Sequence, residues 1–161
     1  MSGTVDLHSH TTASDGRLSP SELIHLFGKR GLKTVAITDH DTTNGLEEAL
    51  KTKGAYPEMN LIAGVELSAD SKDTEMHLLG YFLEYEDDRF QEILSKFREG
   101  RVGRAMTMVK KLSDLGVNLK WERVLEFAGD GAVGRPHIAR TMIEMGYVAS
   151  MSEAFDKYLG R

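Results

Sequence analysis

With 161 residues, the chain can bury one full domain, or one domain with a small addition, but not two full domains. Its hydrophobic and charged fractions, 40% and 28%, exclude a disordered or fibrous protein, and the absence of cysteine excludes disulfides, thiolate catalysis and cysteine-based zinc sites. The net charge of −5 argues against a dominant nucleic-acid surface, because phosphate binding depends on clustered cations.

The amino terminus is typical of a cytoplasmic protein. It reads MSGTVDLHSH, without a basic segment that leads into an apolar one. No stretch of the sequence approaches the ~20 consecutive apolar residues that span a bilayer. We therefore expect a cytoplasmic protein with no membrane partner.

The first half of the chain alternates between strands and helices. The sequence predicts strands over 4–8, 33–38, 60–69 and 76–83, and helices over 20–30 and 45–53. Ser19, Pro20 and Glu22 form the start signature of the first helix, and Asn44 is expected to cap the second, which Gly54 ends. This alternation predicts repeated βαβ units and a largely parallel sheet or barrel.

From about Asp87 the pattern becomes helical. Apolar residues recur at helical spacing from Phe90 to Leu112, and Gly100 and Gly103 predict a bend or a boundary between two helices there. Shorter helices are predicted over 121–128, 137–145 and 152–159. We therefore divide the chain into an α/β portion, 1–86, and an all-helical portion, 87–161.

The helical portion contains a basic segment. Residues 96–123 carry eight Lys or Arg against three acids, a local charge of +5. This segment either helps to attract a phosphorylated substrate or is a solvated helix face without a further role.

Histidines and acids occur where the predicted strands end. His8 and His10 are two residues apart on a strand, so both side chains would leave the same face and reach the same ion. His40 lies between Asp39 and Asp41, two acids that would raise its basicity or orient a ligating ring. Three charged groups at the end of an apolar strand are costly to cover without a cation. A divalent metal site explains them.

Three further residues fit the same site. Taken singly, Asp15 in the turn SDG could form the turn, Glu66 could be a partly exposed strand carboxylate, and His77 could be a histidine near a sheet edge. Taken together with the first three histidines, they place a His or Glu on each of four consecutive strands. The carboxyl ends of such strands are the edge where α/β barrels build active sites.

A separate anion site is predicted in the segment GAVGRPHIAR. Arg135 and His137 lie on either side of a proline just before a helix start, where a guanidinium could hold a phosphate at two points. The alternative is an ordinary helix start. The chain has neither a GxSxG elbow nor a GxxxxGK[ST] phosphate loop, so metal-activated water is the nucleophile that the sequence supports.

The segments DLHSHTTASDG, AITDHDT, GVELSA and HLLGYF, together with GRPHIA, resemble the polymerase and histidinol phosphatase (PHP) superfamily. Within it they are most similar to the phosphoesterases that act on nucleoside 3′,5′-bisphosphates or short RNA 5′ ends. The resemblance runs from residue 6 to about 140 and implies a distorted (β/α)₇ barrel with an all-helical insertion after the fourth strand. Residues 1–86 would be the N-terminal portion of the barrel, and 87–161 the insertion, or cap.

The resemblance also implies the site chemistry. It implies two or three divalent metal ions, most commonly manganese, with iron or zinc as alternatives. The implied metal ligands are His8, His10, Asp15, His40, Glu66 and His77. Arg135 and His137 would contact the phosphate of a small nucleotide or a short RNA, and metal-activated water would hydrolyse the ester. Asp15, where other branches have histidine, favours the nucleotide-type enzymes.

Members of this superfamily continue past the insertion into further barrel strands with additional ligands. Because this sequence has no equivalents of them, we expect either a truncated form or a chain that self-associates through an incomplete barrel edge. The alternative function is then a catalytically incomplete PHP fragment that acts as a metal-binding or assembly module.

Overall fold

The computed structural model describes residues 4–71 and 74–160. The chain forms two compact units, Met1–Phe97 and Arg98–Arg161. Within the described residues, no helix combines the length and the apolar character that a membrane crossing requires.

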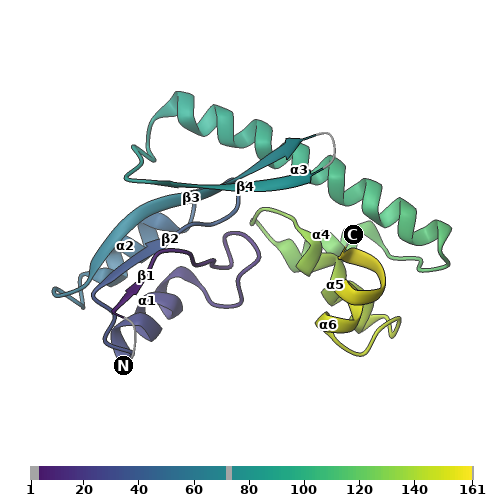
Figure 1. The fold of residues 1–161 in the computed structure, drawn as a ribbon, viewed down its shortest axis with the longest axis horizontal. Helices are drawn as coiled ribbons and strands as arrows, with labels where there is room; N and C mark the ends of the chain where they lie inside the picture. The colour runs from purple at the N-terminus through teal and green to yellow at the C-terminus, as the bar shows by residue number, and fades with distance from the viewer. Residues whose placement is uncertain (1–3, 72–73, 161) are drawn as a thin grey trace. The chain divides into compact units, whose positions relative to one another are not determined.

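The first unit is built on a four-stranded sheet in the order β1-β2-β3-β4 (Figure 1). Its strands are β1 (Val5–Asp6), β2 (Thr34–Ile37), β3 (Asn60–Ser71) and β4 (Thr74–Tyr81). The first three strands are parallel, as predicted, whereas β4 pairs antiparallel with β3. The predicted, largely parallel sheet is therefore confirmed for β1 to β3, and the chain reverses its direction at β4. Only two residues separate β3 from β4, and a parallel connection needs a dozen or more.

The strand β1 is shorter than the predicted 4–8, so His8 and His10 lie in the loop that follows it and not on a strand. Ser9, between them, ties this loop to β2. Its hydroxyl donates to the carbonyl of Ala36 at 2.6 Å, and its own carbonyl accepts the N–H of Thr38 at 2.8 Å. The loop is thus held in register with the end of β2 without being a strand.

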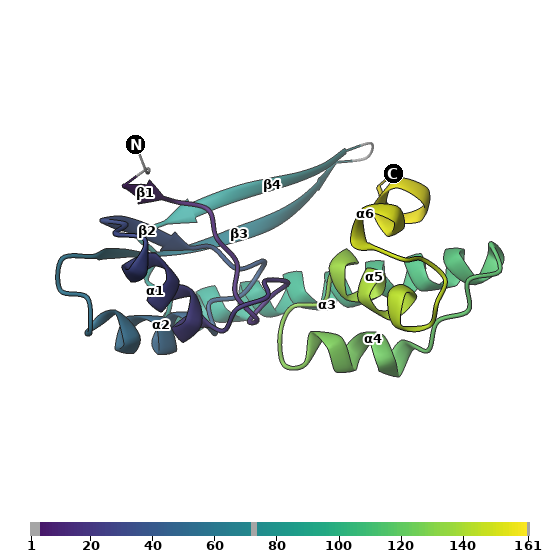
Figure 2. The same cartoon turned by 90° about the horizontal axis from the view of Figure 1, so that it is seen from below.

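The helices α1 (Pro20–Lys29) and α2 (Leu46–Lys53) pack on the same face of this sheet (Figure 2). The predicted start of α1 is confirmed, since Ser19 accepts the N–H of Glu22 and the Glu22 carboxylate accepts the N–H of Ser19. Asn44 does not cap α2, because the N-cap is Gly45 and has no side-chain cap; Gly54 ends the helix as predicted. The core between helices and sheet contains Ile24, Phe27, Val35, Ile37 and Leu46.

The helix α3 (Asp88–Asp114) runs without a break through Gly100 and Gly103, so the predicted helix boundary at these glycines is wrong. A glycine inside a helix costs only ~1 kcal/mol relative to alanine. Burial of apolar side chains on both sides, such as Leu94 and Leu112, offsets this cost.

In the described part of the second unit, Arg98–Arg161, the regular elements are all helices, joined by short loops (Figure 2). After α3 it contains α4 (Trp121–Ala128), α5 (Arg135–Glu144), α6 (Met151–Ala154) and a π-helical turn, η1 (Phe155–Leu159). The three predicted helices are confirmed, although α5 begins two residues earlier, with Pro136 in its first turn, and the last helix is divided between α6 and η1. Its core is apolar and includes Leu112, Val124, Ile138 and Met142.

Candidate metal centre

All six residues predicted as metal ligands gather at one place in the first unit. His8 and His10 come from the loop after β1, Asp15 from the following turn, and His40 from the end of β2. Glu66 lies on β3, next to His40 in an isolated parallel bridge, and His77 lies on β4. The sheet order therefore brings together residues that are up to 69 positions apart in the chain.

Glu66 is at the centre of this cluster and is 4% exposed. Its Oε2 lies 2.8 Å from His8 Nε2, 3.0 Å from His10 Nε2 and 3.6 Å from His40 Nδ1. Its Oε1 lies 2.5 Å from His77 Nδ1. A single carboxylate thus faces all four imidazoles, one of its oxygens toward three of them and the other toward the fourth.

Asp15 closes the other side of the cluster. Its Oδ1 is 3.7 Å from His10 Nδ1 and its Oδ2 is 3.7 Å from His40 Nε2. These distances are too long for hydrogen bonds. They match the separation of about 3–4 Å between ligand atoms that each lie about 2.1 Å from a shared ion.

The arrangement fits divalent metal ions. Three sets of three residues each offer ligand atoms that lie within 4.8 Å of one another. The sets are His8, His10 and Glu66; His10, Asp15 and His40; and His40, Glu66 and His77. The buried Nδ1 of His10 has no hydrogen-bond partner among the described residues, which leaves a buried polar atom that a cation would satisfy. Mixed imidazole and carboxylate donors suit manganese, iron or zinc and do not single out one of them.

The electrostatics keep the central carboxylate charged. Burial raises the pKa of Glu66, but the hydrogen bonds with His8 and His77 and the nearby imidazole of His10 outweigh it, and the net pKa is lowered. Glu66 is therefore ionised at neutral pH, which is the form that binds a cation.

Two aspartates flank His40 and are fully buried. Burial raises the pKa of Asp39, and hydrogen bonds from Ser14 and Thr11 act in the opposite direction. Asp41 accepts hydrogen bonds from the N–H and the hydroxyl of Ser68. Sequence reasoning did not single out Thr11, Ser14 or Ser68. Their hydroxyls, close in sequence to the predicted ligands, were the available signal.

The two predicted phosphate contacts belong to the second unit. His137 is 2% exposed, and its Nδ1 accepts the N–H of Gly134 at 2.9 Å across the first turn of α5. The Nη1 of Arg135 donates to the carbonyl of Leu159 at 3.5 Å. Their role toward phosphate stays a prediction.

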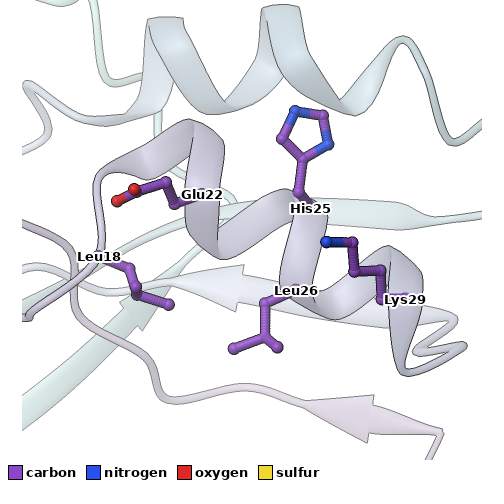
Figure 3. Close-up of a pocket in the computed structure, with 5 residues that line it drawn as sticks. All are labelled: Leu18, Glu22, His25, Leu26 and Lys29. Atoms are coloured by element: carbon purple, nitrogen blue, oxygen red, sulfur yellow. The ribbon is translucent and has the colours of Figure 1, made fainter.

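A surface pocket on α1 is separate from this cluster (Figure 3). Five residues line it: Leu18, Glu22, His25, Leu26 and Lys29. His25 and Leu26 point away from each other in Figure 3, and the Nδ1 of His25 lies 2.8 Å from the hydroxyl of Tyr56. None of the five is among the predicted site residues, and their side chains do not converge.

Residues 6–96, more than half of the chain, match the PHP domain family. The chain belongs to this family. It is 38% identical over 159 residues to the 5′-3′ exoribonuclease Rnm of Salmonella typhimurium, covering 97% of this chain and 54% of that protein. It is 32% identical over 156 residues to a 3′,5′-nucleoside bisphosphate phosphatase of Chromobacterium violaceum, covering 96% and 54%.

A solved structure from Bifidobacterium adolescentis, assigned as a metal-dependent phosphoesterase, superposes on this PHP chain with a TM-score of 0.86. The two are 32% identical, and the match covers 96% of this chain and 55% of the other. The PHP chain spans about half the length of the curated relatives it matches. The predicted fold class, an α/β portion of a PHP barrel with an all-helical region, is confirmed.

Proposed function

We propose that this PHP chain acts in a metal-dependent phosphoesterase that hydrolyses phosphate esters of nucleotides, either nucleoside 3′,5′-bisphosphates or short RNA 5′ ends, by metal-activated water. The observation that carries the proposal is the convergence of four imidazoles and two carboxylates around Glu66. Among the side chains that the structure describes, no comparable cluster of metal-ligating groups is found elsewhere.

The proposed ligands of two or three divalent ions are His8, His10, Asp15, His40, Glu66 and His77. Manganese is proposed first, with iron or zinc as alternatives. When bound, the ions would polarise the phosphoryl group and lower the pKa of a bound water. The two oxygens of Glu66 face different histidines, and this carboxylate would contribute to two of the three ligand sets.

Substrate binding is proposed for Arg135 and His137. The guanidinium of Arg135 would steady the phosphate at two points. The Nδ1 of His137 is already bonded to Gly134, so this ring also holds the start of α5 in place directly beside Arg135. We further propose that residues 87–161 correspond to the helical insertion of the family barrel.

The relatives support a nucleotide or RNA substrate, since one is named as an exoribonuclease and the other as a nucleoside bisphosphate phosphatase. Both names describe hydrolysis of phosphate esters. They do not favour the alternative of a catalytically incomplete metal-binding or assembly module.

The test measures two products, inorganic phosphate from adenosine 3′,5′-bisphosphate and nucleoside 5′-monophosphate from a 5′-phosphorylated short RNA, with metal-free protein before and after addition of Mn²⁺. His10→Ala removes a residue shared by two of the three ligand sets, and we expect kcat/KM to fall by more than about 100-fold, because even residues behind a ligand are worth 10–100-fold. The matched control is His25→Ala on α1. The ring of His25 contacts Tyr56, so this variant should leave activity unchanged.

Two results would contradict the proposal. Equal activity of the two histidine variants would exclude the cluster as the catalytic centre. Tight Mn²⁺ binding without any hydrolysis would favour the alternative function, a metal-binding module, over the enzyme.

A further inference from the structure

We propose that the two aspartates beside His40 are positioning residues, and that each holds a different one of the three ligand sets of the metal centre. Asp39 would hold the set of His10, Asp15 and His40, whereas Asp41 would hold the set of His40, Glu66 and His77. The inference depends on the metal centre proposed above and assigns to it two residues that are not themselves ligands.

Asp39 binds the loop that carries two of the candidate ligands. Its Oδ1 accepts the N–H of Thr11 at 2.7 Å and the hydroxyl of Ser14 at 2.6 Å, and its Oδ2 accepts the hydroxyl of Thr11 at 2.7 Å. All three residues are at most 1% exposed. Water does not compete for these bonds, so they hold the loop in one position.

The sequence positions of these contacts link them to the ligands. Thr11 directly follows His10, Ser14 directly precedes Asp15, and Asp39 directly precedes His40. Each end of the hydrogen-bond network is therefore one residue away from a member of the same ligand set. Loss of Asp39 would release both His10 and Asp15 from the end of β2.

The packing around Asp39 leaves no room for rearrangement. A Cβ built at Gly45 would lie 3.0 Å from the Thr11 hydroxyl and 3.2 Å from Asp39 Oδ2, so the start of α2 closely covers this pair. On the other side of the loop, a Cβ at Gly16 would lie 2.3 Å from the carbonyl oxygen of His10. These two glycines permit the close approach that buries the network.

Asp41 makes the corresponding contacts with β3. Its Oδ1 accepts the N–H of Ser68 at 2.8 Å and its Oδ2 accepts the hydroxyl of Ser68 at 2.7 Å. Ser68 lies two residues beyond Glu66, on the same face of the strand, and is paired with His77 of β4 in the register of the hairpin. Asp41 is therefore connected to the side of the centre formed by Glu66 and His77.

The backbone at Asp41 is specialised for this contact. Its φ of 53° is in the left-handed region, which aspartate tolerates better than most residues. The turn is fixed by hydrogen bonds from Asp41 N–H to the carbonyl of Glu66 at 3.0 Å and from Glu66 N–H to the carbonyl of Asp39 at 3.1 Å. The two aspartates thus point toward different neighbours from either side of His40.

The experiment is a Mn²⁺ titration of the full chain, with bound metal counted by elemental analysis and affinity measured by calorimetry. In Asp39→Asn, one class of Mn²⁺ sites should weaken by about 10–100-fold, the range found for residues that orient ligands. In Asp41→Asn, a different class should weaken, while the remaining sites keep their wild-type affinity. Hydrogen exchange of the metal-free protein should accelerate over 11–16 in the first variant and over 64–68 in the second.

Milder variants keep the test decisive if an aspartate variant does not fold. Thr11→Val and Ser14→Ala each remove one hydroxyl donor to Asp39 and should weaken the same class of sites as Asp39→Asn. The control is Thr141→Ala in the second unit, which also loses a buried hydroxyl, one that donates to the carbonyl of His137, and should bind Mn²⁺ as wild type does.

The outcomes separate this inference from the proposed function. Wild-type Mn²⁺ binding in all the Asp39 and Asp41 variants would overturn the inference and leave the metal centre intact. Equal weakening of every site by both aspartate variants would overturn the assignment of each aspartate to its own ligand set. If the wild-type chain binds no Mn²⁺, the proposed function and this inference fail together.

Discussion

In the unit Met1–Phe97, ten of the buried side chains among the described residues are polar or charged, and all lie between Thr11 and Ser68; in the unit Arg98–Arg161 there are three. Burial of polar groups is costly unless they are hydrogen-bonded. Both units bury an apolar cluster, and the first unit in addition meets the cost of its polar groups by bonding its aspartates to neighbouring loop and strand residues. Apolar packing is thus common to the two units, whereas the buried polar network that surrounds the candidate ligands belongs to the first.

The largest expected effect tests the apolar core of the second unit. Ile138 is 0% exposed, so Ile138→Ala should lower the free energy of unfolding by about 2–5 kcal/mol through lost burial and a cavity. The measurement is urea unfolding followed by fluorescence of Trp121, the only tryptophan, which packs on this core. Met145→Ala, at a 40% exposed position, is the control and should change stability by less than about 0.5 kcal/mol. Similar losses in both variants would remove the contrast between buried core and surface.

The second prediction separates the two units by metal. At 100 times its Kd, Mn²⁺ should stabilise the first unit by about 2.7 kcal/mol, because only the folded state assembles the ligands. Hydrogen exchange measured by mass spectrometry should slow over 8–16, 38–42 and 64–68, and EDTA should reverse the change. Trp121 fluorescence reports the unfolding of the second unit. An equal rise in the unfolding midpoint measured by this fluorescence would show that the metal effect is not confined to the first unit.

The third prediction compares two helical glycines. A Cβ at Gly28 would lie 2.1 Å from the ring of Tyr56, so Gly28→Ala should destabilise the first unit by about 1–3 kcal/mol. A Cβ at Gly100 would meet no atom within 4 Å beyond its own stretch of helix, so Gly100→Ala should stabilise α3 by about 0.5–1 kcal/mol. Thermal unfolding followed by circular dichroism measures both changes. Effects of the same sign would refute the close packing of α1 against Tyr56.

The smallest expected effect concerns an exposed ion pair of the second unit. The hydrogen bond and charge of Arg123 hold the pKa of Glu144 below its ordinary value of 4.5. A lowered carboxyl pKa contributes stability above the ordinary pKa, and that contribution is lost as the pH falls. Glu144→Gln should therefore lower the melting temperature slightly at pH 7, and this difference should shrink as the pH falls below 4.5. A difference that grows toward low pH would contradict the sign of this shift.

Local signals predicted the elements well where they depend on near neighbours. The capping residues Ser19 and Glu22 predicted the start of α1, and helical spacing predicted α4 at its observed bounds. The helix boundary predicted at Gly100 and Gly103 was wrong, because the low helix propensity of glycine is a local property and burial of apolar side chains stabilises this helix. The predicted cap at Asn44 was wrong for a similar reason. Asparagine favours the N-cap position, but the N-cap of α2 is Gly45, one residue later.

The candidate site was predicted as a set of residues, and the structure supplied its connections. His8 and His10 were assigned to the same ion for a wrong reason, since they share a loop and not a strand. The contacts of Asp39 with Thr11 and Ser14 join positions 28 and 25 residues apart in the chain, and a single sequence contains no pattern that pairs them.

The sequence by itself determined which chemistry is possible: without cysteine, with histidines and acids at strand ends, it allows a metal centre of imidazole and carboxylate. It also determined the alternation of strands and helices, because hydrophobic periodicity is a local property. Only the tertiary structure decided that β4 turns back on β3 and places His77 against Glu66, and that Asp39 and Asp41 face different segments. Such contacts depend on strand order and register, which arise from packing between residues far apart in the chain.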